Sequence, residues 1–193
     1  MRTHSASSLR GHLLIATDSL RNSMFRRSVV FLCAHSPAGA MGLVINRPAR
    51  DMTIEDLVPG YERPTGTPPL AEPIHAGGPA EVERSFVLHS CDYHDSEETL
   101  EVTPTFAMTA TNRILRDLVA GRGPKRRLVA LGYAGWGDGQ LDAELRDNAW
   151  FTVAAEPDLV FAAADETKWR GAIAAIGIDP AALSGISTQH GHA

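Results

Sequence analysis

Short apolar runs rich in β-branched residues alternate with turn residues along the first part of the chain. HLLIA (12–16) and SVVFLCAH (28–35) have the composition of strands. The turn SPAG (36–39) joins the second run to AMGLVINRP, which predicts a β-hairpin. The returning strand must end by Arg47, because Pro48 has no N–H to donate to a neighbouring strand.

Helical spacing replaces this pattern further along the chain. TNRILRDLVAG (111–121) carries a narrow apolar stripe that ends at a glycine, which predicts a helix. RLVALGY (127–133) is the most apolar predicted strand, and QLDAELRDNAW after it predicts a helix. DETKWRGAIAAIG (165–177) predicts another helix, capped by Asp165. Further short elements are expected within 74–81, 85–90, 100–110 and 151–163.

Turn signals separate these elements. TIEDLV (53–58) predicts a short helix with Thr53 as its N-cap, and residues 59–73 form a predicted extended loop with five of the twelve prolines. DPAALS (179–184) predicts a last helical turn. Hairpins come first and αβ units later, so the sequence predicts an α+β fold with a mixed sheet.

Length and composition fit one soluble domain. The 193 residues are 44% hydrophobic and 21% charged, and we expect residues 9–193 to form one domain behind a disordered 1–8. The longest clean apolar run, Val29–Ala34, is too short for a membrane span, and no signal-peptide core precedes it. Cys33 and Cys91 form no CxxC pair, which favours neither a zinc site nor a disulfide framework. These features predict a cytoplasmic protein, and we expect no metal or cofactor.

The net charge of −5 is unevenly distributed. Residues 1–50 hold seven arginines and one acid, Asp18, whereas residues 51–193 hold 11 basic and 22 acidic residues. A basic N-terminal part is typical of a nucleic-acid contact. The simpler interpretation is that these arginines pair with acids of the second half, since phosphate binding depends on net charge and the whole chain is acidic. The arginines concerned are Arg10, Arg21, Arg26, Arg27, Arg47 and Arg50. No helix-turn-helix with a basic recognition helix appears either, so direct DNA binding is not expected.

GYAGWGDGQLDAEL (132–145) has the layout of a phosphate-binding loop, with a strand, glycines and a helix in order. Its spacing nevertheless fits neither nucleotide motif. Asp142 stands where the Rossmann fingerprint needs its third glycine, and Asp138 takes the lysine position of the Walker pattern. Acids in the first helical turn would also repel a phosphate.

Two interpretations of these glycines remain. In one, they allow a tight strand-to-helix turn, with Asp138 as the helix cap and Trp136 buried beside it. In the other, they leave the backbone open beside Tyr133, Trp136 and Gln140, so that a ligand or a partner can approach closely.

Five stretches carry distinctive motifs. They are GAMGLVINRP (39–48), HAGGPAE (75–81), LGYAGWGDGQLDAELRDNAW (131–150), KWRGAIAAIGID (168–179) and the terminal GHA (191–193). In this order they resemble the YqgE/AlgH family of bacterial proteins, and the resemblance covers almost the whole chain from Leu9 onward. One departure is Ala80, where the family usually has valine after GGP.

The resemblance implies a fold and little chemistry. It implies an α+β arrangement in which a mixed, bifurcated β-sheet curls into a pseudo-barrel with flanking helices. It implies no established biochemical activity. One branch of the family carries the label of a transcriptional regulator, which names an effect on expression rather than a reaction.

Three of these stretches, VINRP, AGGPAE and GYAGWGDGQL, lie at the ends of strands, where binding sites are commonly built on a rigid scaffold. We expect them to converge on one surface that binds a ligand or a partner. The candidate residues are Asn46 and Arg47 as polar anchors, Gly77 and Gly78 as backbone donors beside Pro79, and Tyr133, Trp136 and Gln140 as a wall. The alternative is that all of them are turn residues needed for folding.

Other candidate chemistry is weaker. HSCDYHDSEE contains residue types that bind metals, but its spacing matches no zinc signature and favours a solvated acidic loop. There is no GxSxG motif. Cys33 lies in an apolar strand, where a thiol should be inert, and His35 on the same face is only a slight indication of a Cys–His pair.

The sequence therefore favours a non-catalytic binding or regulatory protein with a protein or small-molecule partner and no membrane contact. The alternative is a small-ligand receptor or an enzyme that uses the same three loops. A pocket of several hundred Å³ with convergent polar groups would favour the alternative, whereas a flat patch would favour the first hypothesis.

Overall fold

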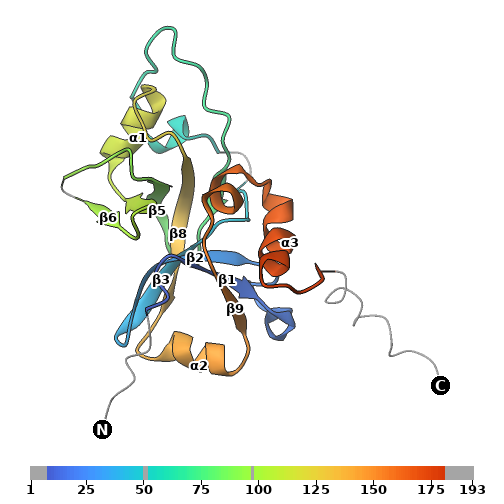
Figure 1. Ribbon diagram of the computed structural model, residues 1–193. Coiled ribbons are helices and arrows are strands. Elements are labelled where there is room, and N and C mark those ends of the chain that lie inside the picture. The colour runs from blue at the N-terminus through green and yellow to red at the C-terminus, as the bar shows by residue number, and fades with distance from the viewer. Residues whose placement is uncertain (1–7, 50–51, 97, 181–193) are drawn as a thin grey trace.

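A computed structural model describes residues 8–49, 52–96 and 98–180 (Figure 1). Its strands are β1 (His12–Ala16), β2 (Val29–Ser36), β3 (Gly39–Val44), β4 (Ile74–Ala76), β5 (Ala80–Ser90), β6 (Thr99–Glu101), β7 (Phe106–Thr109), β8 (Arg127–Trp136) and β9 (Trp150–Ala154). Its α-helices are α1 (Asn112–Val119), α2 (Gln140–Arg146) and α3 (Asp165–Ala175). Single helical turns are η1 (Asp18–Leu20), η2 (Glu55–Leu57) and the π-turn η3 (Asp158–Ala162). None of the described helices has the length and apolar character of a membrane span.

The sheet is organised around β8. Its strand order is β6-β7-β5-β8-β3-β2-β1-β9, and β4 pairs with β8 outside this path. The first half of β8 lies between antiparallel β5 and parallel β4, whereas its last residues, Ala134–Trp136, pair with β3. The sheet is therefore mixed and bifurcates along β8, and it curls into a half-barrel with helices at its sides (Figure 1). The α+β fold that the resemblance implied is confirmed.

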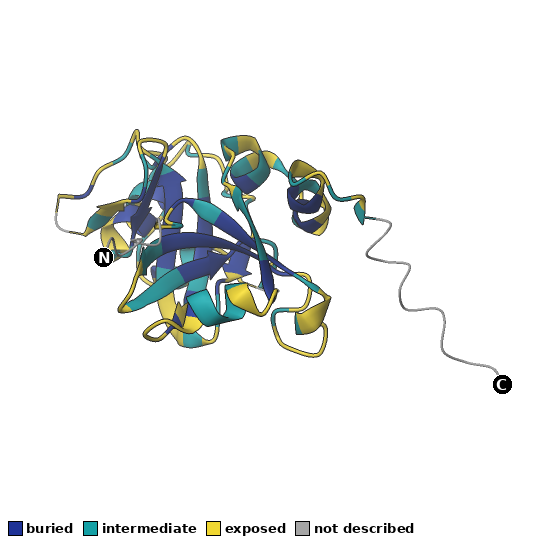
Figure 2. Ribbon diagram, turned by 60° about the horizontal axis from the view of Figure 1, so that its bottom comes forward, coloured by how far each residue is buried: buried dark blue, intermediate teal, exposed yellow. Residues whose placement is uncertain are grey.

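Three apolar clusters hold the elements together. The largest fills the inside of the curl and is closed by η3 and α3, with Phe31 and Ile173 fully buried in it. The second lies under α2 around Trp136 and Trp150, and the third lies under α1. Figure 2 shows buried residues along the strands and exposed ones on the outer sides of the helices. The apolar stripe predicted for 111–121 is confirmed, since all four of its members are buried: Ile114, Leu115, Leu118 and Val119.

Two glycines after β4 allow the chain to cross directly over β8. The N–H of Gly77 donates to the carbonyl of Leu131 at 2.8 Å. A Cβ on Gly78 would lie 2.1 Å from the carbonyl carbon of Tyr133, and one on Gly132 would lie 2.5 Å from the oxygen of Gly78. No side chain fits at these distances, so the crossing requires glycine.

Two of the predicted helix caps are wrong. The N-cap of α2 is Gly139, in the left-handed conformation at φ 63°, and not Asp138. The N-cap of α3 is Ala164, while Asp165 is the first residue of that helix. The carboxylate of Asp165 bonds to the side chains of His75 and Lys168 instead of the N–H groups at the start of α3.

Other boundaries also differ from the sequence predictions. The helix predicted at 53–58 is only the turn η2, and its N-cap is Ile54. The hydroxyl of Thr53 donates to the carboxylate of Asp56 (2.9 Å) and does not cap a helix. The strand-like segment at 100–110 is interrupted around Pro104, as its proline predicts, and forms β6 and β7. Apart from Ser8, the N-terminus predicted to be disordered lies outside the described residues, as does most of the turn predicted at 179–184.

Replacing Gly78 tests the crossing. We expect Gly78→Ala to lower the free energy of unfolding by about 3 kcal/mol or more, because the new Cβ would overlap the backbone of β8. Gly60→Ala is the matched control: its φ of +80° is also left-handed, but nothing lies within 4 Å of the added Cβ, so it should lose only about 1 kcal/mol. Equal losses in urea unfolding would contradict the steric account.

Candidate functional site

An open pocket of ≈ 750 Å³ lies at one end of the half-barrel, between the β2–β3 hairpin, β5, β7 and the end of β8. Its apolar lining includes Met41, Phe86, Met108, Tyr133 and Trp136. Phe86 and Met108 belong to the cluster inside the curl, and Met41 and Tyr133 pack against it. The floor of the pocket is therefore continuous with the core. Charged lining comes from Glu81, Arg84 and Glu98.

A large bulge in β5 forms the rim of the pocket. Between the pairs that β5 makes with Leu131 and Tyr133 of β8, residues 81–84 have no strand partner. Glu81 has a φ of 45°, in the left-handed region that side chains other than glycine rarely adopt. Its carboxylate accepts hydrogen bonds from Arg84 (3.1 Å) and from the hydroxyl of Tyr133 (3.4 Å). Bulges and strained residues of this kind concentrate at binding sites.

The predicted wall is formed in part. Tyr133 and Trp136 line the pocket, whereas Gln140 on α2 does not. The indole N–H of Trp136 donates to Glu144 (2.9 Å), which also accepts from Trp150 (2.8 Å) and Gln140 (2.9 Å). Glu144 thereby fixes α2 against two tryptophans, and Gln140 is occupied in the same contact.

Asn46 and Arg47 lie at the other end of β3 and do not line the pocket. The side chain of Asn46 accepts from the N–H of Val29 (2.9 Å) and donates to the carbonyl of Arg27 (2.8 Å). Arg47 donates to the carbonyl of Arg26 (2.7 Å). Both side chains therefore hold the loop that precedes β2.

The backbones of the three predicted loops do meet. The N–H of Val44 donates to Gly77, and the N–H of Ala76 donates to Arg47, each at 2.8 Å. Because the N–H of Gly77 is bonded to Leu131, it is not free to hold a ligand. Pro79 is exposed where the chain enters β5. The loops thus pack together, while their side chains divide between the pocket and the far end of β3.

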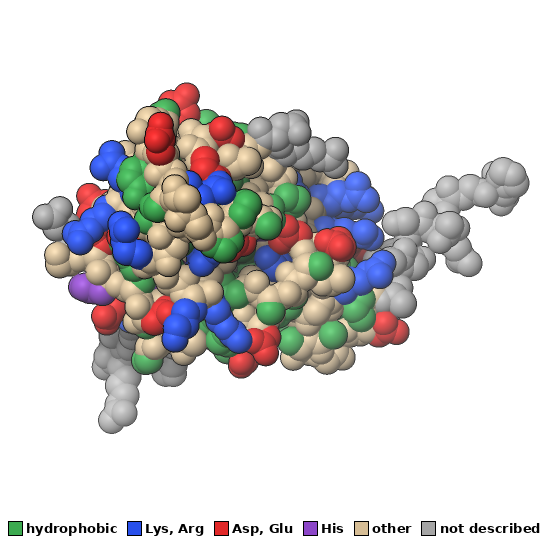
Figure 3. Space-filling model, turned by 90° about the horizontal axis from the view of Figure 1, so that it is seen from above, with side chains coloured by type: hydrophobic (Ala, Val, Ile, Leu, Met, Phe, Trp, Pro, Cys, Tyr) green, Lys and Arg blue, Asp and Glu red, His purple; other side chains and the backbone are tan. Residues whose placement is uncertain are grey.

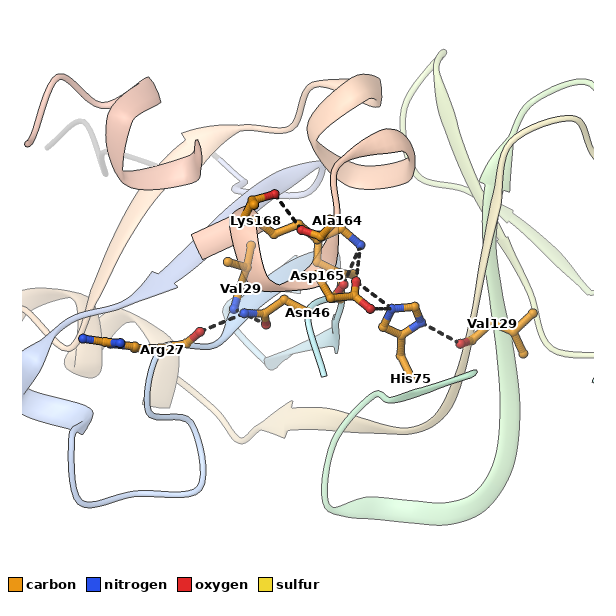
Figure 4. Close-up of polar contacts among 10 residues, drawn as sticks. Arg27, Val29, Asn46, His75, Val129, Ala164, Asp165 and Lys168 are labelled. Atoms are coloured by element: carbon orange, nitrogen blue, oxygen red, sulfur yellow. Dashed lines mark hydrogen bonds and ion pairs between the residues drawn. The ribbon is translucent and has the colours of Figure 1, made fainter. Parts of the chain in front are cut away.

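A buried polar cluster that the sequence did not indicate connects α3 to the sheet (Figure 4). Nε2 of His75 lies 3.0 Å from the carboxylate of Asp165, and its Nδ1 lies 3.3 Å from the carbonyl oxygen of Val129. Nζ of Lys168 donates to Asp165 and to the carbonyl of Ile45, both at 2.8 Å. Burial by itself would raise the pKa of Asp165, but its bonds to His75 and Lys168 outweigh burial and lower that pKa below its ordinary value.

The remaining candidates hold little reactive chemistry. Burial raises the pKa of Cys33 to about 12, which disfavours the reactive thiolate form. In the described part of 89–98, Cys91, Asp92, His94, Ser96 and Glu98 are exposed, as a solvated loop predicts. His89 is fully buried against Thr109 (2.9 Å), and Asp95 is also buried. Over the described ranges, no three His, Cys, Asp or Glu side chains are grouped to hold a metal ion.

Comparison with known proteins assigns the chain to a family. The sequence profile described as AlgH-like matches residues 13–181. The chain belongs to the AlgH-like family. It is 47% identical over 186 residues to a UPF0301 protein of Jannaschia sp. (strain CCS1), which covers 96% of this chain and 95% of that relative. A UPF0301 protein of Ruegeria pomeroyi is 46% identical over 186 residues, 96% of this chain and 99% of its own.

Solved structures extend the AlgH-like assignment to the fold. The solution structure of the AlgH protein from Pseudomonas aeruginosa superimposes with a TM-score of 0.76 at 37% identity, covering 100% of both chains. The crystal structure of a Corynebacterium diphtheriae protein has a TM-score of 0.65 at 19% identity, over 84% of each chain, and shares the fold. The resemblance found in the sequence is confirmed.

The buried cluster of this AlgH-like chain predicts an acid-sensitive stability. Asp165 has a lowered pKa in the folded state, so its contribution is present above the unfolded pKa of about 3.9 and is lost as the pH falls through the folded pKa. Asp165→Asn should flatten this fall and, because Lys168 then loses its charged partner, destabilise the fold by about 3–5 kcal/mol at neutral pH. Unfolding in urea between about pH 3 and 7 measures both effects. Asp158→Asn, at a surface ion pair with Arg126, should change neither, and an unchanged acid slope in Asp165→Asn would contradict the assignment.

The two thiols should differ in reactivity. We expect iodoacetamide to modify the exposed Cys91 in the folded protein and to leave Cys33 intact until urea unfolds the chain. Peptide mass spectrometry after timed labelling measures this order. Early labelling of Cys33 would instead indicate an activated thiol.

Proposed function

We propose that this AlgH-like protein is a cytoplasmic, non-catalytic binding protein whose pocket takes a small ligand with an apolar body and a positively charged head. The pocket itself carries the proposal. Its volume of ≈ 750 Å³ lies within the range of small-molecule sites, and apolar walls with a few polar groups are typical of them. Of the two hypotheses drawn from the sequence, this favours ligand binding over a flat contact surface.

The position of the charges supports the choice of ligand. The charged groups of the lining are two carboxylates, Glu81 and Glu98, and one guanidinium, Arg84. Arg84 is already engaged, because it pairs with Glu81 and lies 5.2 Å above the ring of Phe86. The rim is therefore net negative and favours a cationic group, while the floor accepts an apolar chain.

The lining also supports binding rather than reaction. The side chains that line the pocket in the described residues include no histidine or cysteine, so a thiol–imidazole or hydroxyl–imidazole pair is not formed there. A regulatory role, including an effect on transcription, would then act through the occupied or empty state of the pocket and a further partner.

Thermal unfolding with a ligand panel tests the proposal. The panel contains nucleotides, common metabolites, decyltrimethylammonium and decanoate, the last two below their micelle concentrations. A ligand at about 100 times its Kd stabilises by roughly 2.7 kcal/mol, which raises Tm by about 5–10 °C in a chain of this size. We expect the cationic amphiphile to shift Tm more than decanoate.

Two glycine variants provide the control. Gly135 lines the pocket, and its added Cβ would meet only the ring of Tyr133, so Gly135→Leu should obstruct part of the cavity and reduce the shift. Gly137→Leu adds the same side chain two residues away, outside the lining, and should keep the shift. If decanoate stabilises as well as the cation, or if Gly135→Leu keeps the shift, the proposal is contradicted.

A further inference from the structure

The loop that connects β1 to β2 forms a second exposed surface, remote from the pocket lining. After η1 it continues as successive turns, closed by backbone bonds from Ser23 to Leu20 (3.0 Å), from Arg26 to Ser23 (3.2 Å) and from Ser28 to Phe25 (2.8 Å). Leu20 and Phe25 anchor it in the cluster under α2. The loop is thus tightly bonded although it contains no strand.

Its C-terminal end is fixed in a strained conformation. Arg27 has a φ of 53°, which is rare for a residue with a side chain. The side chain of Asn46 bridges the carbonyl of Arg27 and the N–H of Val29, which holds this conformation (Figure 4). The guanidinium of Arg27 lies 5.4 Å above the ring of Trp169 on α3. Strain that is held by dedicated contacts is frequently functional.

The arginines of this loop are not neutralised. The sequence predicted that the N-terminal arginines would pair with acids from the second half of the chain. For the described arginines this is wrong, and Arg50 lies outside the described residues. None of the N-terminal arginines that the structure describes forms an ion pair with a described residue: Arg10, Arg21, Arg26, Arg27 and Arg47. Over much of the face drawn in Figure 3, Lys and Arg side chains lie among Asp and Glu.

An apolar side chain stands among these charges. Met24 is 57% exposed, whereas Leu20 and Phe25 on either side of it are half-buried and pack against the cluster under α2. Arginine and methionine are both enriched in protein interfaces, and an unbranched thioether adapts to many partner shapes.

We propose that Arg21, Met24, Arg26 and Arg27, with Arg47 beside them, form a docking surface for an acidic protein segment that carries an apolar anchor. Guanidinium groups match carboxylates in bidentate geometry, and Met24 supplies the apolar contact. Nucleic acid fits less well, because the chain has a net charge of −5 and a phosphate backbone offers nothing to an exposed methionine. This surface does not depend on the pocket or on its ligand.

Fluorescence anisotropy with defined probes tests this surface. The probe is a short fluorescein-labelled peptide in which Asp and Glu flank leucines. It is compared with an oligoglutamate of equal charge, a DNA duplex and phosphatidylglycerol vesicles. We expect the leucine-containing peptide to bind tightest and to weaken between about 50 and 200 mM salt, because part of the attraction is between charges.

Matched variants locate the contact. Arg21→Gln with Arg26→Gln should weaken peptide binding about tenfold or more, whereas Arg116→Gln with Arg146→Gln removes two other exposed, unpaired arginines and should leave it unchanged. Met24→Ser should weaken the leucine-containing peptide but not oligoglutamate, while Val82→Ser, at a side chain 58% exposed, should affect neither. Far-UV circular dichroism checks that each variant folds.

Three results would overturn the proposal. Oligoglutamate binding as tightly as the leucine-containing peptide would remove the role of Met24. Tighter binding to the duplex or to the vesicles, lost in the loop variant, would assign the surface to nucleic acid or to a lipid surface. Equal peptide binding by both arginine double variants would place the contact elsewhere.

Discussion

The crossing of Gly77 and Gly78 over β8 is the constraint on which the rest of the structure depends. Here two backbones touch without side chains between them, and a Cβ on Gly78 would lie only 2.1 Å from β8. The crossing places β4 and β5 on opposite edges of β8 and leaves the end of β8 free to pair with β3. The sheet therefore divides, and the bulge at 81–84 and the pocket beside it follow from that division.

Polar contacts hold α3 and the loop before β2 against the sheet that the glycine crossing organises. The cluster of His75, Asp165 and Lys168 attaches α3 to β4 and to the backbone at Ile45, and so closes the core inside the curl. The side chain of Asn46 likewise attaches the loop before β2 to the end of β3. Two residues of the motif GAMGLVINRP thus serve two different surfaces: Met41 lines the pocket, and Asn46 holds the β1–β2 loop at the other end of β3.

Regular elements with strong local patterns could be predicted from the sequence, and contacts between distant segments could not. The hairpin at 28–48 and the apolar stripe of α1 follow from spacing alone. The bulge at 81–84 could not be predicted, because it exists only through the register in which β5 pairs with β8 on either side of these residues. His75 and Asp165 are 90 positions apart, so no local signal connects them. Gln140 and Asn46 were recognised by motif, but their partners give them supporting contacts outside the pocket.

The claim that the pocket is a binding site is tested most directly by ¹H–¹⁵N correlation spectra of the folded protein during titration with decyltrimethylammonium. The account predicts saturable shifts confined to the β2–β3 hairpin, the bulge at 81–84 and the end of β8, with none at 21–28. Shifts that are absent, that never saturate, or that fall mainly on residues 21–28 or on α1 would contradict it.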